Sequence, residues 1–346
     1  MNGYRVIRLA RFSIRLMPQR FTILLALALC LTLVAVWSLT AGSHPITASS
    51  LWSLITRANA DPVATDAVMV LDFRLSRLAL AMVSGAMLGI AGAIMQATTR
   101  NSLADPGLLG VREGASLAVL GCLFLLPSLP VAFRPLAGIA GGMASAAIVF
   151  SLSGVTSRLR FVLTGIGFSW FLSALLLTLM ASLDIRNLQT AMIWMAGNLQ
   201  GASWTAVSIL SAILAITLCL LLLSARAADV QALGDNSAAA LGVHTRWLSA
   251  LHVVLAVILT ASCVSFTGSI GFVGLIGPHI ARLLLPGGSH PGLVVGAGLA
   301  GATLVATADT IARTAFSPLE LPTGLVLSAV GTPTLLILLW FHRHRL

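Results

Sequence analysis

The chain has 346 residues, of which 58% are hydrophobic and only 9% are charged, and its mean hydropathy is +1.00. A soluble domain carries about 25% charged residues, so this composition excludes a mainly soluble protein and indicates a single transmembrane domain over residues 1–346. All twenty basic residues are arginine. The absence of lysine excludes a Walker A P-loop and a lysine Schiff base, so any ATP hydrolysis that drives this protein must come from another chain.

The net charge of +10 is dispersed between apolar segments, which indicates orientation in a bilayer rather than binding of nucleic acid. Residues 1–20 contain five arginines and no acid, and an apolar run follows from about residue 21 to residue 39. The positive-inside rule therefore predicts a basic cytoplasmic N-terminus over residues 1–20. The basic tail, residues 342–345, predicts a cytoplasmic C-terminus as well.

Apolar segments along the chain predict an all-α polytopic membrane protein with about ten transmembrane helices. The predicted crossings are residues 21–39, 75–98, 112–127, 136–153, 161–183, 205–224, 248–267, 278–285, 292–312 and 323–341. The eighth is a half-helix, because the glycine-rich stretch 268–285 predicts a broken or re-entrant element. Residues 184–203 are too polar to span and predict a short interfacial helix, and residues 225–247 form the longest internal polar segment.

Two features of the second crossing point to packing and to a turn. Gly85, Gly89 and Gly92 form a small-residue stripe that would let another helix approach its backbone closely. The residues that follow, Asn101-Ser102-Leu103-Ala104-Asp105-Pro106-Gly107, predict a helix C-cap and a tight turn.

Three arginines, Arg74, Arg77 and Arg313, are predicted at the outer ends of membrane helices, against the positive-inside bias. They either anchor helix ends by snorkelling or form a docking surface for a soluble protein with acidic residues. Asp309 lies one turn before Arg313 and is predicted to be its buried partner, with proton coupling as the alternative.

The polar segment 229–246 predicts a short helix that Asp235 or Asn236 caps and that Gly242 ends after Leu241. This helix is either a connector or a docking element. His279 has no second ligand at metal-binding spacing, and the four cysteines lie in apolar stretches, so no metal site is predicted.

Several of these stretches together resemble the FecCD family, the membrane-spanning subunits of ABC importers for iron–siderophores, haem and vitamin B12. The resemblance covers nearly all of residues 70–340 and is carried by RLSR at 74–77, NSLADPGLLGV at 101–111, ALGDNSAAALG at 232–242, GSIGFVGLIGPHIAR at 268–282 and ADTIAR at 308–313. Ser76 and Ser102 stand where the family usually has proline.

The resemblance implies the type II ABC importer permease fold, as in the vitamin B12 permease, and it assigns roles to matching residues. Arg74, Arg77 and Arg313 would meet glutamates on a substrate-binding protein. The implied cytoplasmic gate consists of Asn101, Ser102 and Leu103 and, by a looser alignment, Leu159 and Arg160. The residues implied to couple the permease to an ATPase are Ala232, Leu233, Gly234, Asp235, Ala239, Leu241 and Gly242.

The implied function is ATP-driven import into the cytoplasm by alternating access, with an iron–siderophore as the favoured cargo and haem or cobalamin as alternatives. The implied partners are a second permease subunit (a paralogue rather than a second copy), two ABC ATPases that use ATP and Mg²⁺, and an external binding protein. No cofactor is expected on this chain, which would reside in the bacterial cytoplasmic membrane. An ion-coupled secondary transporter remains the alternative class, with Asp309 as its coupling candidate. An intramembrane enzyme is disfavoured because the chain has no HExxH or GxSxG motif.

Overall fold

The computed structural model describes residues 5–9, 12–16, 18–42, 69–126, 128, 133–153, 158–315, 317 and 319–342. A short hairpin precedes the helices: β1 (Arg5–Leu9) pairs antiparallel with β2 (Phe12–Leu16). The sequence analysis predicted a basic N-terminus over residues 1–20 and did not predict this hairpin. The rest of the regular structure in the described ranges is helical, which confirms the predicted polytopic helical fold.

Seven described helices are long and apolar enough to cross a membrane. They are α1 (Pro18–Thr40), α4 (Leu75–Thr99), α6 (Arg134–Ser153), α7 (Arg158–Ala181), α9 (Trp204–Gln231), α11 (Thr245–Thr267) and α13 (His290–Thr314). The other three predicted crossings correspond to α5 (Val111–Leu125), α12 (Val273–Leu284) and α14 (Thr323–His342). The chain is therefore a multi-pass membrane protein.

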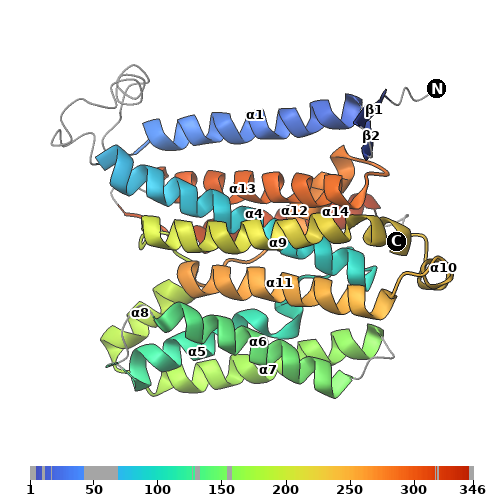
Figure 1. Ribbon diagram of the computed structural model, residues 1–346. Coiled ribbons are helices and arrows are strands. Elements are labelled where there is room, and N and C mark those ends of the chain that lie inside the picture. The colour runs from blue at the N-terminus through green and yellow to red at the C-terminus, as the bar shows by residue number, and fades with distance from the viewer. Residues whose placement is uncertain are drawn as a thin grey trace.

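Four short helical elements connect or flank these helices, namely the π-helical turn η1 (Met69–Arg74), the 3-10 turn η2 (Pro106–Leu109), α8 (Ile185–Met195) and α10 (Asp235–Ala240). Figure 1 shows the long helices side by side, with α10 and the β1–β2 hairpin at one end of the bundle and α8 at the other. We call these the α10 end and the α8 end. The short helix predicted between residues 184 and 203 corresponds to α8.

Helix α4 forms the centre of the bundle. In its most apolar stretch 78% of the residues are buried, against 17% in α1 and α7, and it packs on α11, α12 and α13. Its glycine stripe allows this burial, because a Cβ atom at any of the three positions would collide with the backbone of a neighbouring helix. The colliding carbonyl oxygens belong to Gly301 at Gly85, Ala297 at Gly89 and Gly274 at Gly92. The predicted close helix approach is confirmed.

The predicted broken element lies between α11 and α12. Gly268 and Phe272 have positive φ angles of 70° and 67°, and the non-helical backbone between them is buried or partly buried, as the predicted broken element requires. The half-helix begins at Val273, whereas the sequence analysis placed its start at Pro278. That boundary was wrong because Pro278 lies inside the helix, where its only backbone loss is one hydrogen bond to the preceding turn.

Candidate functional site

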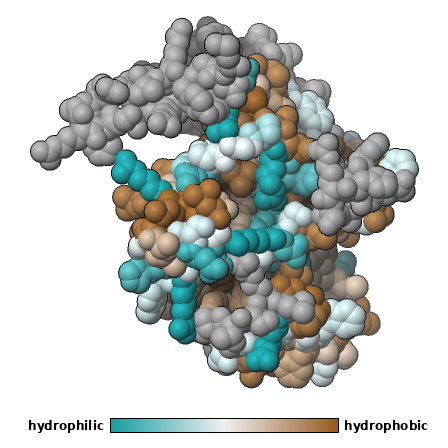
Figure 2. Space-filling view, turned by 90° about the vertical axis from the view of Figure 1, so that its right-hand side faces the viewer, coloured by the Kyte–Doolittle hydropathy of each residue, from teal (hydrophilic) through white to brown (hydrophobic). Residues whose placement is uncertain are grey.

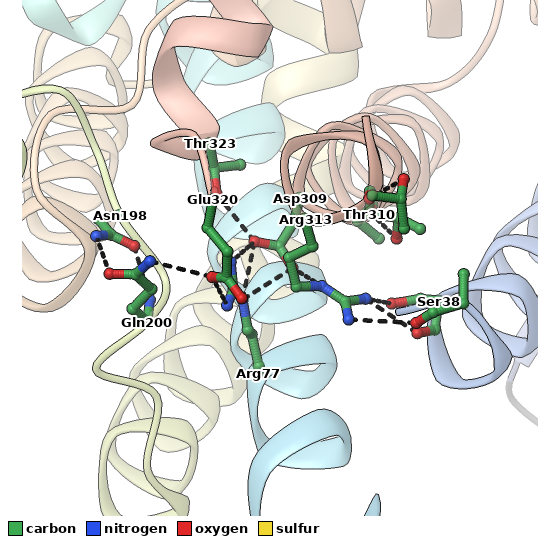
Figure 3. A network of polar contacts seen from close by, with 12 residues as sticks. Ser38, Arg77, Asn198, Gln200, Asp309, Thr310, Arg313, Glu320 and Thr323 are labelled. Atoms are coloured by element: carbon green, nitrogen blue, oxygen red, sulfur yellow. Dashed lines mark hydrogen bonds and ion pairs between the residues drawn. The ribbon is translucent and has the colours of Figure 1, made fainter. Parts of the chain in front are cut away.

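The α8 end of the bundle contains a cluster of ion pairs centred on Arg77, in the first turn of α4. The Arg77 Nε donates to both carboxylate oxygens of Asp309 at 3.1 Å, and its Nη2 donates to Asp309 Oδ1 at 3.0 Å. The remaining nitrogen, Nη1, donates to Glu320 Oε2 at 2.8 Å (Figure 3). The Asp309 carboxylate is 2% exposed and also accepts a hydrogen bond from Thr323 Oγ1 at 2.9 Å. Such multiple charge-assisted bonds fix the orientation of both side chains.

Arg313 and Arg74 bind the C-terminal end of α1. The Arg313 Nη2 donates to the carbonyl and hydroxyl oxygens of Ser38 at 2.9 and 3.0 Å, and the Arg74 Nη1 donates to the Leu39 carbonyl at 2.8 Å. The last carbonyls of a helix lack intrahelical donors and lie at the negative end of its dipole, so two guanidinium groups stabilise this end. Arg313 also pairs with Asp309 at 3.4 Å, which confirms the predicted partnership.

Glu320 is the outermost member of the cluster and lies on the segment between α13 and α14. Its side chain is 37% exposed, and Oε2 also accepts a hydrogen bond from Gln200 Nε2 at 3.0 Å. Burial raises the pKa of Glu320, but hydrogen bonds from Arg77 and Gln200 and the charges of Arg77 and Arg313 lower it further, so its pKa lies below the ordinary value. The carboxylate is therefore ionised at neutral pH.

The three arginines predicted for docking thus lie together at the α8 end, but two of them are mostly enclosed. The side chains of Arg77 and Arg313 are 12% and 10% exposed and pair with carboxylates of this same chain. Sequence reasoning missed Glu320 and the Arg77–Asp309 pair. The available signal was that Glu320 is the only acid in the short loop FSPLELP, which follows Arg313 closely.

At the α10 end, α4 terminates in the turn predicted for the gate. Arg100 ends the helix with a φ of 51°, and Asn101 Oδ1 then accepts a hydrogen bond from the Leu103 N–H at 2.9 Å. The φ of Arg100 and the hydrogen bond to Asn101 confirm the predicted helix end and turn. Ser102 and Leu103 are exposed in this turn, and the role of these residues as a gate stays a prediction.

The second predicted gate strip lies in the first turn of α7. Arg160 is exposed there, and the side chain of Leu159 lies outside the described part of the structure.

The predicted coupling segment contains the short helix α10. Gly242 ends it with a φ of 82°, and the hydrogen bonds from Gly242 N to Ala239 O and from Val243 N to Ala238 O form a Schellman motif. The predicted N-cap was wrong: Gly234, with a φ of 119°, caps the helix and Asp235 is its first residue. Asp235 instead accepts a hydrogen bond from Arg100 Nη2 at 2.9 Å.

This contact joins the predicted gate turn to the predicted coupling segment, because Arg100 Nη2 also donates to the Gln231 carbonyl at 3.1 Å. Two leucines flank α10, Leu233 and Leu241, and they are 70% and 66% exposed. Figure 2 looks onto this end, where hydrophilic side chains gather across the middle of the face. Exposed apolar side chains within such a face indicate an interaction site.

A cavity of about 290 Å³ lies next to α10, where the ends of α4, α9 and α13 meet α11, and two histidines that sequence reasoning missed line it. The rings of His252 and His290 stack with centroids 5.3 Å apart, and His252 Nε2 lies 3.0 Å from Ser224 Oγ. The backbone N–H of His290 donates to Asp229 Oδ1 at 2.6 Å. The described residues contain no group of three or more His, Cys, Asp or Glu side chains that could hold a metal ion.

The long apolar helices packed around α4, with short helices at both ends of the bundle, define the class as a multi-pass helical membrane protein. The family model described as the FecCD transport family matches residues 29–341. The chain therefore belongs to the FecCD family.

Characterised relatives support this membership over most of their length. The chain is 40% identical over 268 residues to the Fe(3+) dicitrate transport system permease protein FecD of Escherichia coli, covering 77% of this chain and 83% of that protein. It is 36% identical over 327 residues to the hemin transport system permease protein HmuU of Yersinia pestis, covering 92% and 95%. A solved metal-chelate type ABC transporter in an inward-facing conformation superposes with a TM-score of 0.82 at 29% identity, covering 92% of this chain and 99% of that one.

Proposed function

We propose that this chain is the permease subunit of an ATP-driven importer that moves ferric chelates into the cytoplasm by alternating access. The observation that carries the proposal is the connection at the α10 end, where a surface helix flanked by exposed leucines is hydrogen-bonded through Asp235 and Arg100 to the turn that follows α4. Relatives named for ferric dicitrate and hemin transport support a ferric chelate, with an iron–siderophore as the favoured cargo.

In this proposal the α10 end faces the cytoplasm and α10 binds an ABC ATPase. Leu233 and Leu241 would enter an apolar cleft of the ATPase, which supplies ATP and Mg²⁺ chemistry that a chain without lysine cannot provide through a P-loop. Closure of the two ATPase subunits would push α10, and the Asp235–Arg100 ion pair would carry that displacement to the turn at residues 101–107.

The α8 end would face the outside and receive a soluble binding protein. The cluster there combines three arginines, Arg74, Arg77 and Arg313, with the carboxylates of Asp309 and Glu320, and an acidic partner would complement the arginines. Lipid and a second permease subunit, with a paralogue favoured, would cover the exposed apolar side chains of the long helices. The candidate of the secondary-transport alternative, Asp309, is bound by two arginines and a threonine of this chain.

The test is reconstitution of the permease with its ATPase and binding protein in proteoliposomes, followed by uptake of radiolabelled ferric citrate and ferric hydroxamate. We expect uptake only with ATP. The variant Leu233→Asp/Leu241→Asp should lose both ATPase co-purification and uptake, whereas Leu319→Asp, an equally exposed leucine at the α8 end, should keep the ATPase. Uptake driven by a proton gradient without the ATPase would refute the proposal.

A further inference from the structure

The guanidinium of Arg77 has two edges with different surroundings. Its Nε and Nη2 face Asp309, which is almost completely buried on α13 and is also held by Thr323 and Arg313. Its Nη1 faces Glu320 alone, and Glu320 lies on the connecting segment at the surface. The two ion pairs of one arginine therefore differ in how readily an outside group can replace them.

Replacing Asp309 would leave buried charges without partners, which is strongly unfavourable. Replacing Glu320 is much easier, because a half-exposed ion pair contributes little and the released carboxylate moves into water. The neighbouring residue, Leu319, is 74% exposed, so the segment offers little packing to hold Glu320 in place. Gln200 supplies the other hydrogen bond to this carboxylate, through Nε2.

We propose that Glu320 is a displaceable internal partner of Arg77, and that an acidic protein docks at the α8 end by placing its own carboxylate on Arg77 Nη1 in place of Glu320. This inference rests on the proposed function, in which this end receives a binding protein. Glu320 sets the affinity of docking by competition, since every complex must first break the 2.8 Å contact with Arg77.

A chain of hydrogen bonds connects Glu320 to the non-helical stretch between α11 and α12. Glu320 binds Gln200, and Gln200 Oε1 accepts a hydrogen bond from Asn198 Nδ2 at 2.9 Å (Figure 3). The backbone N–H of Asn198 donates to the Thr267 carbonyl at 2.8 Å, directly before the break that precedes α12. Release of Glu320 therefore frees the side chains that attach the α8–α9 connection to the cluster, next to the one non-helical stretch that separates α11 from α12.

The experiment measures binding of the importer's purified, ferric-chelate-loaded binding protein to the permease–ATPase complex in nanodiscs. Glu320→Gln keeps the shape of the side chain and removes its charge. We expect the Kd of the Glu320→Gln complex to fall by about threefold to fivefold, the effect of losing one half-exposed ion pair, and the gain to shrink at high salt. Asp184→Asn is the matched control: it removes a carboxylate that caps α8 at the same end, keeps a capping side chain, and should leave the Kd unchanged.

An unchanged or higher Kd for Glu320→Gln, with normal binding to the unmutated complex, overturns the inference and leaves the proposed function standing. Absence of binding to the folded, unmutated complex overturns docking at this end and the inference with it. If Glu320→Gln lowers the thermal stability, the same binding measurement is made with the variant Gln200→Ala. That substitution removes the second hydrogen bond to Glu320 and so loosens its side chain without changing any charge. This variant should also lower the Kd, by a smaller factor, and an unchanged Kd overturns the inference.

Discussion

Replacing Asp309 by asparagine removes the carboxylate that Arg77 and Arg313 share, while the size of the side chain stays the same. In the unmutated protein the pairs lie at 3.0 and 3.4 Å in a cluster that is nearly closed to water. The amide can still accept the hydrogen bond from Thr323 but carries no charge. The buried guanidinium groups of Arg77 and Arg313 then lose the negative charge that compensates for their removal from water.

Breaking a buried ion pair by removing one partner costs about 3–5 kcal/mol. Arg77 keeps Glu320, and Arg313 keeps the Ser38 oxygens at the end of α1, so we expect the lower limit, about 3 kcal/mol of unfolding free energy. The effect should also appear as strong coupling: the double variant Arg77→Gln/Asp309→Asn should be more stable than the sum of the two single losses predicts.

The assay is denaturant unfolding of the detergent-solubilised protein, with Asp184→Asn as the control for loss of an exposed carboxylate at the same end. The control should stay within about 0.5 kcal/mol of the unmutated protein. A loss below about 1 kcal/mol for Asp309→Asn, or additive effects in the double variant, would show that water screens the cluster and that the reasoning from burial is wrong.

Three further predictions follow from other contacts. Gly92→Ala should destabilise the protein by about 3 kcal/mol in the same unfolding assay, because its Cβ meets the rigid backbone at Gly274, whereas Gly121→Ala meets open space and should be neutral or slightly stabilising. Arg100→Ala should leave ATPase binding intact and lower the uptake per ATP hydrolysed, since the bond from Asp235 to the turn after α4 is lost; an unchanged ratio would exclude this route. The contact of Glu320 should be fully present above its ordinary pKa of 4.5 and be lost only as the pH falls through its lower pKa in the folded protein. Hydrogen exchange of the adjacent Leu321 amide, corrected for intrinsic rates, should therefore rise in acid, and it should not depend on pH in this way in Glu320→Gln.

Local patterns in the sequence were sufficient for much of this fold. Hydropathy alone located the apolar segments, because each long helix satisfies its own backbone hydrogen bonds and needs only apolar side chains to lie in lipid. The break after residue 267 and the end of α10 at Gly242 were predicted from the backbone conformations open to a few consecutive residues. The glycine stripe of α4 was predicted from its spacing along one helix, whereas the helices that contact it were not.

Only the tertiary structure decided which charges meet. Arg77 and Asp309 lie 232 positions apart, and Arg100 and Asp235 lie 135 apart, so their contacts depend on how α4 packs against the elements that carry the acids. The sequence placed Arg74, Arg77 and Arg313 at helix ends, but it did not show that Asp309, Glu320 and the end of α1 already bind them. Hydropathy and turn chemistry act over a few neighbouring residues, whereas an ion pair requires two side chains to be brought within about 4 Å by packing of the whole bundle.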